Sequence, residues 1–277
     1  MRRGMQRAIL IMFVAMSLIP AGDAAGKLLS SQLGVAPIFV AWSRFALGTL
    51  LLLPFMPAGT MLLLRDWRIW VRAALIACGI SSIQMSLQST DIATVFAAFF
   101  IAPIFSFALA ATFLKEPVSS LRSILILIGF FGVLLVVRPS TAEAGVLWAV
   151  AAGLFYGGFL TLTRALSHLG SPLSLTFSQL FIAGILLTPI SISHLPQATL
   201  PIAGLTLASA LFSMLGNLLL LYTYRIAPAT KLAPLVYFQL VAAVALGWAI
   251  FADFPDAYTW AGLAVIIVAG LASARIR

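Results

Sequence analysis

Side chains that could bind or react with another molecule are few in this sequence, and most stand within long apolar runs. One guanidinium, several amides and hydroxyls, and a set of aromatic rings fall near the centres of those runs. These residues are Ser17, Arg44, Gln84, Phe99, Tyr156, Gln179, Ser213, Asn217, Tyr237 and Gln239. Amides and hydroxyls bind polar groups through hydrogen bonds, and aromatic rings bind apolar groups. We predict that the set binds a small amphipathic molecule and includes no catalytic residue.

The groups that reactive sites require are missing from the centres of these runs. Asp23 and Asp91 are expected near run ends, so no carboxylate is predicted at mid-depth. Cys78 is the only cysteine, and the two histidines lack the spacing of metal ligands. Neither a disulfide within the chain nor a metal site is therefore expected. No GxxxxGK[ST] phosphate-binding loop occurs, so the sequence predicts no cofactor and no use of ATP.

The composition indicates that lipid surrounds most of the chain. Charged residues make up 8% of the 277 residues and hydrophobic residues 62%, whereas soluble domains carry about 25% charged residues. A membrane-spanning helix needs about 20 apolar residues, so ten helices would use most of the chain. No room remains for a separate soluble catalytic domain. The net charge of +9 is explained by the placement of the basic residues, and no nucleic-acid partner is expected.

Apolar runs between charges, prolines and glycine clusters predict ten membrane-spanning helices. They cover residues 8–26, 36–55, 69–89, 92–113, 121–137, 145–165, 172–190, 200–222, 228–251 and 257–274. Ten spans place both termini on one side, where thirteen of the sixteen Lys and Arg residues also fall. Lys27 and Arg138 fall on the other side. Because basic loops are retained in the cytoplasm, we predict a multi-pass protein of the bacterial cytoplasmic membrane with both termini inside.

The second half of the sequence repeats features of the first at a nearly constant offset. Pro37 and Pro172 are 135 residues apart, and the FLKEP and FADFP segments are 138 residues apart. Each half holds five predicted spans, and an odd number makes the halves cross the membrane in opposite senses. We predict an all-α integral membrane fold of two inverted five-helix repeats, residues 1–138 and 139–277. This architecture is typical of transporters, whose substrate site lies near the midplane.

Several segments resemble the EamA-type family of the drug/metabolite transporter superfamily. They are SRFALGTLLLLP at 43–54, the stretch from Pro103 to FLKEP at 113–117, IGFFGVLLVV at 128–137, and a weaker copy ending in FADFP at 251–255. The resemblance covers the whole chain and, within the family, is greatest to the YddG-type exporters of aromatic amino acids. It implies a ten-helix bundle of two inverted repeats. One position departs from the family pattern, because Phe254 replaces the acidic residue that Glu116 supplies in the first copy.

Arg44 and the amides each have two interpretations. Arg44 could anchor a substrate carboxylate, or it could be a structural arginine that satisfies carbonyl groups of a broken helix. Each glutamine or asparagine could bind substrate or could hold two helices together. Ser213 and Asn217 are four residues apart and therefore share one helix face.

Prolines within predicted helices mark sites of bending. Pro20, Pro103 and Pro234 each remove one internal hydrogen bond from a helix. Kinked fourth and ninth helices serve as flexing points in the resembled family. The resemblance therefore implies that Pro103 and Pro234 act as hinges. The alternative is that each proline produces only a static kink.

The leading functional hypothesis is export of a small amphipathic metabolite by alternating access, with aromatic amino acids as the first substrate class. The lack of a mid-depth carboxylate predicts uniport without a proton gradient. Export of other amino acids or of drugs is an alternative. An intramembrane enzyme acting on lipid phosphates is the alternative from a different class, and Lys115, Glu116 and Arg122 are its only candidates. Expected partners are the substrate and membrane lipid. The oligomeric state is left open, and a monomer is compatible with the sequence.

Overall fold

The computed structural model describes residues 2–113, 120–137, 143–226 and 238–275, and every regular element among them is a helix. The principal helices are α1 (Arg2–Lys27), α2 (Pro37–Leu52), α3 (Trp67–Leu87), α4 (Ile92–Phe99), α5 (Ile101–Phe113), α6 (Ser120–Val137), α7 (Ala144–Ala165), α8 (Pro172–Ile192), α9 (Leu200–Ile226), α11 (Phe238–Phe251) and α12 (Ala257–Arg275). A π-helical segment, Leu28–Gln32, prolongs α1, and two short 3₁₀ segments, Leu53–Phe55 and Thr60–Arg65, join α2 to α3. Each of the ten predicted ranges overlaps one or more of these helices.

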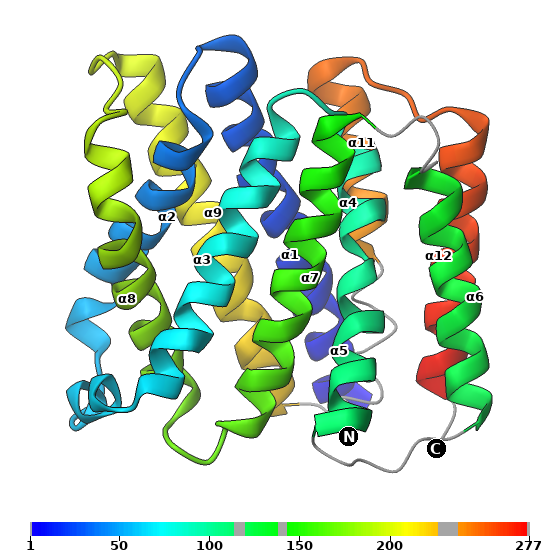
Figure 1. Ribbon diagram of the computed structural model, residues 1–277, viewed down its shortest axis with the longest axis horizontal. Coiled ribbons are helices and arrows are strands. Elements are labelled where there is room, and N and C mark those ends of the chain that lie inside the picture. Colours follow the sequence, from blue (N-terminus) through cyan, green and yellow to red (C-terminus); the bar gives the residue numbers. More distant parts are fainter. Residues whose placement is uncertain (1, 114–119, 138–142, 227–237, 276–277) are drawn as a thin grey trace.

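Length and composition make this a multi-pass membrane protein. Within the described residues, seven helical stretches are long and apolar enough to cross a membrane. Shorter apolar helices at Leu127–Val136, Phe238–Phe251 and Ala257–Ala269 accompany them. In Figure 1 the helices run roughly side by side, and α1 begins at the end of the bundle where α12 finishes.

Helix starts follow local sequence signals. Pro37 and Pro172, which the repeat aligns with each other, are the first residues of α2 and α8, where a proline lacks only a hydrogen bond that the helix would not have made. The Asp66, Asp91 and Ser171 side chains cap α3, α4 and α8 by accepting hydrogen bonds from backbone N–H groups. Such caps satisfy donors that have no partner within the helix. Their positions fix where each helix begins, and hence the depth of the side chains that follow.

The fourth predicted span is broken in the middle. Helix α4 ends at Phe99, Phe100 leaves helical geometry, and α5 restarts at Ile101. Pro103 cannot donate to the carbonyl of Phe99, four residues earlier, and the break lies at that carbonyl. The kink predicted from Pro103 is therefore present, whereas its action as a hinge stays a prediction. Pro234, the other predicted hinge, lies outside the described residues.

Packing within the bundle joins helices that are distant in sequence. Helix α1 packs along α9, α3 along α7, and α6 along α12, and the α6–α12 pair forms one edge of the bundle in Figure 1. Gly262 lets the last pair approach closely, because a Cβ there would lie 2.7 Å from the carbonyl oxygen of Gly132. The largest apolar cluster is built around Phe96 and Ile92 of α4 and Leu87 of α3, and it includes side chains of α6, α7, α11 and α12. Helix α4 therefore packs inside the bundle, and α3 contacts α2, α7 and α8.

Candidate functional site

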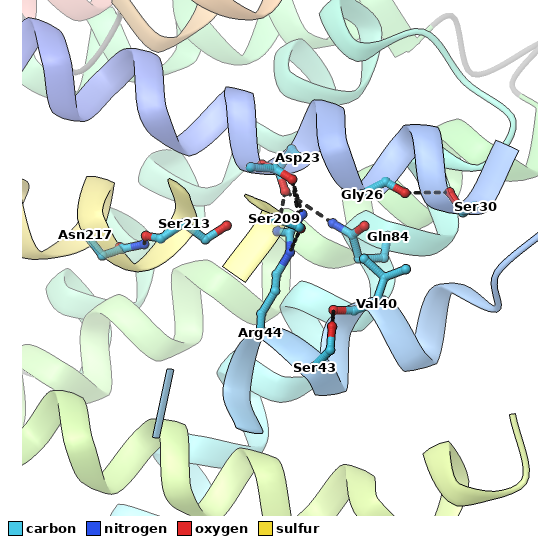
Figure 2. Close-up of polar contacts among 11 residues, drawn as sticks. Asp23, Gly26, Ser30, Val40, Ser43, Arg44, Gln84, Ser209, Ser213 and Asn217 are labelled. Carbon is cyan, nitrogen blue, oxygen red and sulfur yellow. Dashed lines mark hydrogen bonds and ion pairs between the residues drawn. The ribbon is translucent and has the colours of Figure 1, made fainter. Parts of the chain in front are cut away.

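A buried ion pair joins α1 to α2 in the interior of the bundle. Arg44 of α2 donates from Nη1 to Asp23 Oδ1 of α1 over 2.5 Å, and only 7% and 6% of the two side chains are exposed. The same guanidinium donates from Nη2 to the Gly22 carbonyl at 2.7 Å and from Nε to the Ser209 hydroxyl of α9 at 2.8 Å. Figure 2 shows these groups converging between the helices. The positive charge of Arg44 is thus neutralised inside the protein.

Gln84 brings α3 into this cluster. Its Nε2 donates to Asp23 Oδ1 at 3.2 Å, and its side chain is fully buried. Its Oε1 has no hydrogen-bond partner in the structure. A buried amide oxygen without a donor carries an energetic cost that a water molecule or a ligand could remove. We call Asp23, Arg44, Gln84 and Ser209 the paired cluster.

Two glycines of α1 make room for the paired cluster. A Cβ on Gly26 would lie 2.7 Å from Arg44 Nη2, and one on Gly22 would lie 3.0 Å from the Ser209 carbonyl oxygen. Gly22 and Gly26 are four residues apart and therefore face the same way. The polar side chains of α2, α3 and α9 consequently reach the backbone of α1.

The position of Asp23 corrects the expectation that this carboxylate lies near the end of its helix. The prediction ended the first helix at residue 26, which left Asp23 near its end. Instead, the helical stretch continues from Gln6 to Gln32, so Asp23 stands nine residues before its end. Nine residues correspond to about 13 Å along a helix axis. The π-helical extension is the feature that the sequence did not reveal.

A line of hydroxyl and amide groups on α9 leads to the paired cluster. Ser209, Ser213 and Asn217 lie at successive four-residue steps along the helix, as Figure 2 shows. Asn217 is exposed and donates from Nδ2 to the Ser213 carbonyl at 2.7 Å, whereas the buried Ser213 hydroxyl has no partner. The predicted shared face of Ser213 and Asn217 is confirmed. Their contact with a substrate stays a prediction.

A second buried arginine lies where α3, α7 and α8 meet. Arg72 of α3 is 3% exposed. It donates from Nε to Thr163 Oγ1 at 2.7 Å, from Nη1 to the Leu175 carbonyl at 3.0 Å and from Nη2 to Gln179 Oε1 at 2.8 Å. Its guanidinium carbon also lies 4.7 Å from the centroid of the Phe159 ring. The structure therefore gives the predicted residue Gln179 a cationic neighbour, Arg72, which is one of the thirteen basic residues counted on the side of the termini.

Aromatic rings extend from this arginine toward α4. Successive ring centroids are 5.6 Å apart for Phe159 and Tyr156, 5.1 Å for Tyr156 and Phe99, and 6.5 Å for Phe99 and Phe96. These separations are typical of favourable aromatic contacts. The predicted pair Phe99 and Tyr156 is thus brought together. We call Arg72, Gln179, Thr163 and the rings of Phe159, Tyr156 and Phe99 the aromatic–cation cluster.

The remaining predicted residues stand apart from both clusters. Ser17 donates to the Phe13 carbonyl of its own helix at 2.9 Å, and Gln239 is buried near the start of α11. No hydrogen bond among the described residues links either of them to Arg44 or Arg72. Tyr237 lies outside the described residues, as do the side chains of Lys115, Glu116 and Arg122 that the enzyme hypothesis needs.

A second ion pair lies where α1 passes into its π-helical extension. Lys27 donates to Asp253 Oδ2 at 2.9 Å and to the Thr90 carbonyl at 3.0 Å, and it lies 4.7 Å from the centroid of the Phe251 ring. It thereby ties α1 to the segments that precede α4 and α12. Asp253 adjoins Phe254, the position at which the sequence lacks the family's acidic residue.

No metal site is built by the part of the chain that the structure describes. It contains no group of three or more His, Cys, Asp or Glu side chains that could hold a metal ion. The functional groups present are hydrogen-bond donors, acceptors, fixed charges and rings. Such groups bind and orient molecules.

Comparison with known families matches the chain to a family of transporters. A family model described as the EamA-like transporter family matches residues 6–138 and, separately, residues 143–274. The two matches together cover nearly the whole chain. The expectation that the chain resembles this family is confirmed.

Named relatives of similar length are transporters. The chain is 26% identical over 275 residues to a riboflavin transporter of Brucella anthropi, covering 94% of this chain and 95% of that protein. It is 27% identical over 262 residues to an S-adenosylmethionine uptake transporter of Rickettsia felis, covering 91% and 86%. It is 30% identical over 179 residues to the pseudopaline exporter CntI of Pseudomonas aeruginosa, covering 63% of each. These names do not favour the aromatic amino-acid exporters that the sequence resemblance had singled out.

A solved crystal structure shares the fold. It superimposes with a TM-score of 0.66 at 18% sequence identity, covering 98% of this chain and 96% of that chain. At this identity the likeness defines the fold alone.

Proposed function

The chain belongs to the EamA-like transporter family, and from this premise we propose that it carries a small amphipathic organic metabolite across the membrane by alternating access. The observation that carries the proposal is the paired cluster. Charged groups are expensive inside a membrane bundle, and those that occur there mark substrate pathways or buried partners. Here a charged pair, a fully buried amide and a serine converge from four helices, and the amide oxygen is left without a donor.

The proposed architecture is ten membrane-spanning helices in two inverted five-helix repeats, residues 1–138 and 139–277. Two separate family matches, at 6–138 and 143–274, support the division. The shared role of Pro37 and Pro172 as first residues of α2 and α8 supports it further. The bias of basic residues supports an orientation with both termini in the cytoplasm of a bacterial cell and the protein in the inner membrane. Inverted repeats provide alternating access because each half can adopt the conformation of the other.

The proposed substrate has a flat apolar part and a polar end. The rings of the aromatic–cation cluster supply an apolar bed, and the amides and hydroxyls supply hydrogen bonds. Relatives are named for riboflavin, S-adenosylmethionine and pseudopaline, and for both uptake and export. We therefore keep aromatic amino acids as one class among several and leave the direction to the substrate gradient.

Transport is proposed to proceed without a coupled proton. The carboxylate of Asp23 is buried, but Arg44 already compensates its charge. No proton is then needed to neutralise Asp23 during the cycle. Flux that disappears when an imposed pH gradient is collapsed, at constant substrate gradient, would contradict this step.

The test of the proposed function is flux into liposomes that contain the purified protein. We expect at least one compound of a panel (riboflavin, S-adenosylmethionine, aromatic amino acids and aromatic acids) to cross faster than in empty liposomes. Gln84→Ala and Asn217→Ala should each slow that flux, whereas Leu127→Ala, at a position 66% exposed, should not. Thermal stability is measured on the same variants. Loss of flux in proportion to loss of stability would make the amides structural, and a panel without any flux would refute transport of these classes.

A further inference from the structure

Arg72 is a buried cation for which the described residues supply no anion. Its three hydrogen-bond acceptors are a hydroxyl, a carbonyl and an amide oxygen, all of them neutral. Ion pairs elsewhere in the described chain involve Lys27, Arg44 and Arg68. Burial of an uncompensated charge is costly. The face of Phe159 offsets part of that cost through a cation–π contact.

Arg72 and the amide of Gln179 together present hydrogen-bond donors. A guanidinium has five N–H groups, and three of them are used by Thr163, Leu175 and Gln179. Each Nη atom therefore carries one further N–H besides those that bind Leu175 and Gln179. Because Gln179 turns its Oε1 toward Arg72, its Nε2 is left to donate as well. Two adjacent N–H groups in a plane suit the two oxygens of a carboxylate.

A row of aromatic rings begins at the guanidinium group of Arg72. Phe159, the ring under the guanidinium, is followed by Tyr156 and then by Phe99 at centroid separations of 5.6 and 5.1 Å. Tyr156, Phe99 and Gln179 are half-buried, whereas Arg72 is almost completely covered. A molecule that reached these rings would find the cation at one end of the row.

Resting on the proposed transport function, we propose that the aromatic–cation cluster binds organic anions in which a carboxylate is attached to a flat ring. The carboxylate accepts from Arg72 and Gln179, and the ring stacks on Tyr156 and its neighbours. Among the ion pairs of the described residues, none brings a carboxylate to Arg72, Gln179 or Thr163, so the ammonium group of a zwitterion gains no counter-charge from them. The site therefore prefers net anions to zwitterionic amino acids.

The first test uses the unmodified full-length protein in lipid nanodiscs and three probes of similar size: benzoate, benzamide and phenylalanine. Benzoate carries the anion, benzamide is its neutral counterpart, and phenylalanine adds an ammonium group. We expect benzoate to raise the melting temperature and to bind about ten-fold or more tightly than either competitor. Benzamide lacks the charge-assisted hydrogen bonds of a carboxylate, and phenylalanine carries an ammonium group that would be buried without a counter-charge. Equal binding of benzoate and benzamide, or of benzoate and phenylalanine, would overturn the proposal.

The second test supplies the missing anion from within the protein. Gln179→Glu preserves side-chain length and places a carboxylate at the atom that lies 2.8 Å from Arg72 Nη2. We expect this variant to melt at a higher temperature than the unmodified protein and to lose the response to benzoate. Gln32→Glu, at an exposed position, is the matched control and should change neither property. An unchanged benzoate response in Gln179→Glu would overturn the proposal, as would a lower melting temperature.

Flux measured in parallel separates this inference from the proposed function. Transport of other panel compounds without any preference for benzoate would refute the anion site and leave the transporter standing. Absence of flux for every compound would refute the proposed function itself.

Discussion

Two arginines of nearly equal burial, Arg44 and Arg72, have opposite electrostatic surroundings. Arg44 is 7% exposed and Arg72 is 3% exposed. Each donates three hydrogen bonds to neighbouring helices. One of the three acceptors of Arg44 is the carboxylate of Asp23, whereas all three acceptors of Arg72 are neutral. The paired cluster therefore contains a closed pair, in which the opposite charges of Asp23 and Arg44 cancel. The aromatic–cation cluster retains one positive charge.

The difference separates two uses of a buried charge. A closed pair is expensive to break from either side, because the partner that remains is left buried and uncompensated. An unpaired cation that is already held by neutral acceptors leaves no such charge behind when it is removed. Within the paired cluster, the ion pair of Asp23 and Arg44 is thus suited to holding α1 against α2, and the Gln84 oxygen without a donor is the group left for a substrate. The aromatic–cation cluster is suited to exchanging one anion for another.

The largest expected effect comes from breaking the closed pair. Asp23→Asn removes the counter-charge of Arg44 and should lower the free energy of unfolding by about 3–5 kcal/mol. The measurement is equilibrium unfolding in detergent. The double variant Asp23→Asn with Arg44→Gln removes both charges and should recover part of the loss. Losses that simply add in the double variant would show that the two charges do not compensate each other.

The next effect tests how tightly the paired cluster is packed against α1. Gly26→Ala introduces a Cβ 2.7 Å from Arg44 Nη2 and should lower the free energy of unfolding by about 1–3 kcal/mol, as overpacking does. Gly204→Ala is the matched control, since no atom lies within 4 Å of its Cβ position. It should be neutral or slightly stabilising because alanine favours helix over glycine. Equal effects of the two substitutions would refute close packing at Gly26.

Removal of the unpaired cation, Arg72, should lower the free energy of unfolding less than removal of Asp23. Arg72→Gln breaks three hydrogen bonds but leaves only neutral groups behind, so we expect a loss of about 1–2 kcal/mol in unfolding free energy without ligand. Unfolding of this variant and of Asp23→Asn is compared under identical conditions. A loss as large as that of Asp23→Asn would mean that Arg72 is itself a structural anchor, and the contrast between the two arginines would fail.

The smallest effect on stability is expected from Asp66 and Arg68, an arginine–aspartate ion pair at the start of α3. Asp66 caps α3 and accepts from Arg68 Nη2 at 2.6 Å. The hydrogen bonds from the Arg68 side chain and backbone lower the pKa of Asp66 below its ordinary value of 3.8. A lowered pKa stabilises the folded state above the ordinary pKa, and the contribution disappears as the pH falls through the lowered value. Asp66→Asn should therefore shift the melting temperature only slightly at neutral pH and not at all in strong acid, in thermal scans across this range.

The sequence predicted which segments are helical better than the direction in which their side chains point. Apolar runs located helices in all ten predicted ranges, and Arg44 and Gln84 were correctly singled out as polar groups within them. Periodicity does not define how a helix is rotated against its neighbours, so the contact between Asp23 and Arg44 could not be predicted. The π-helical extension that moved Asp23 inward left no sequence signal that we recognised.

Arg72 was missed for a different reason. It lies five residues after the Trp67 that begins α3, within a basic segment typical of a membrane interface, and was counted there. A signal was nonetheless present, because Arg72 shares a helix face with Ile69 and Ile76, three residues before and four after it. Both isoleucines are buried. A charged residue on an otherwise apolar helix face is therefore expected to be buried with that face.

The most direct test of the central claim, carriage by alternating access, is counterflow in liposomes. A carrier returns faster across the membrane when it is loaded, so the compound identified in the flux panel should enter as a labelled tracer several-fold faster when the liposomes are preloaded with the unlabelled compound. The tracer rate is compared between preloaded and empty liposomes at the same external concentration. Accelerated entry in preloaded liposomes is the result expected of an alternating-access carrier. Equal initial rates in the two preparations would contradict it and indicate a channel.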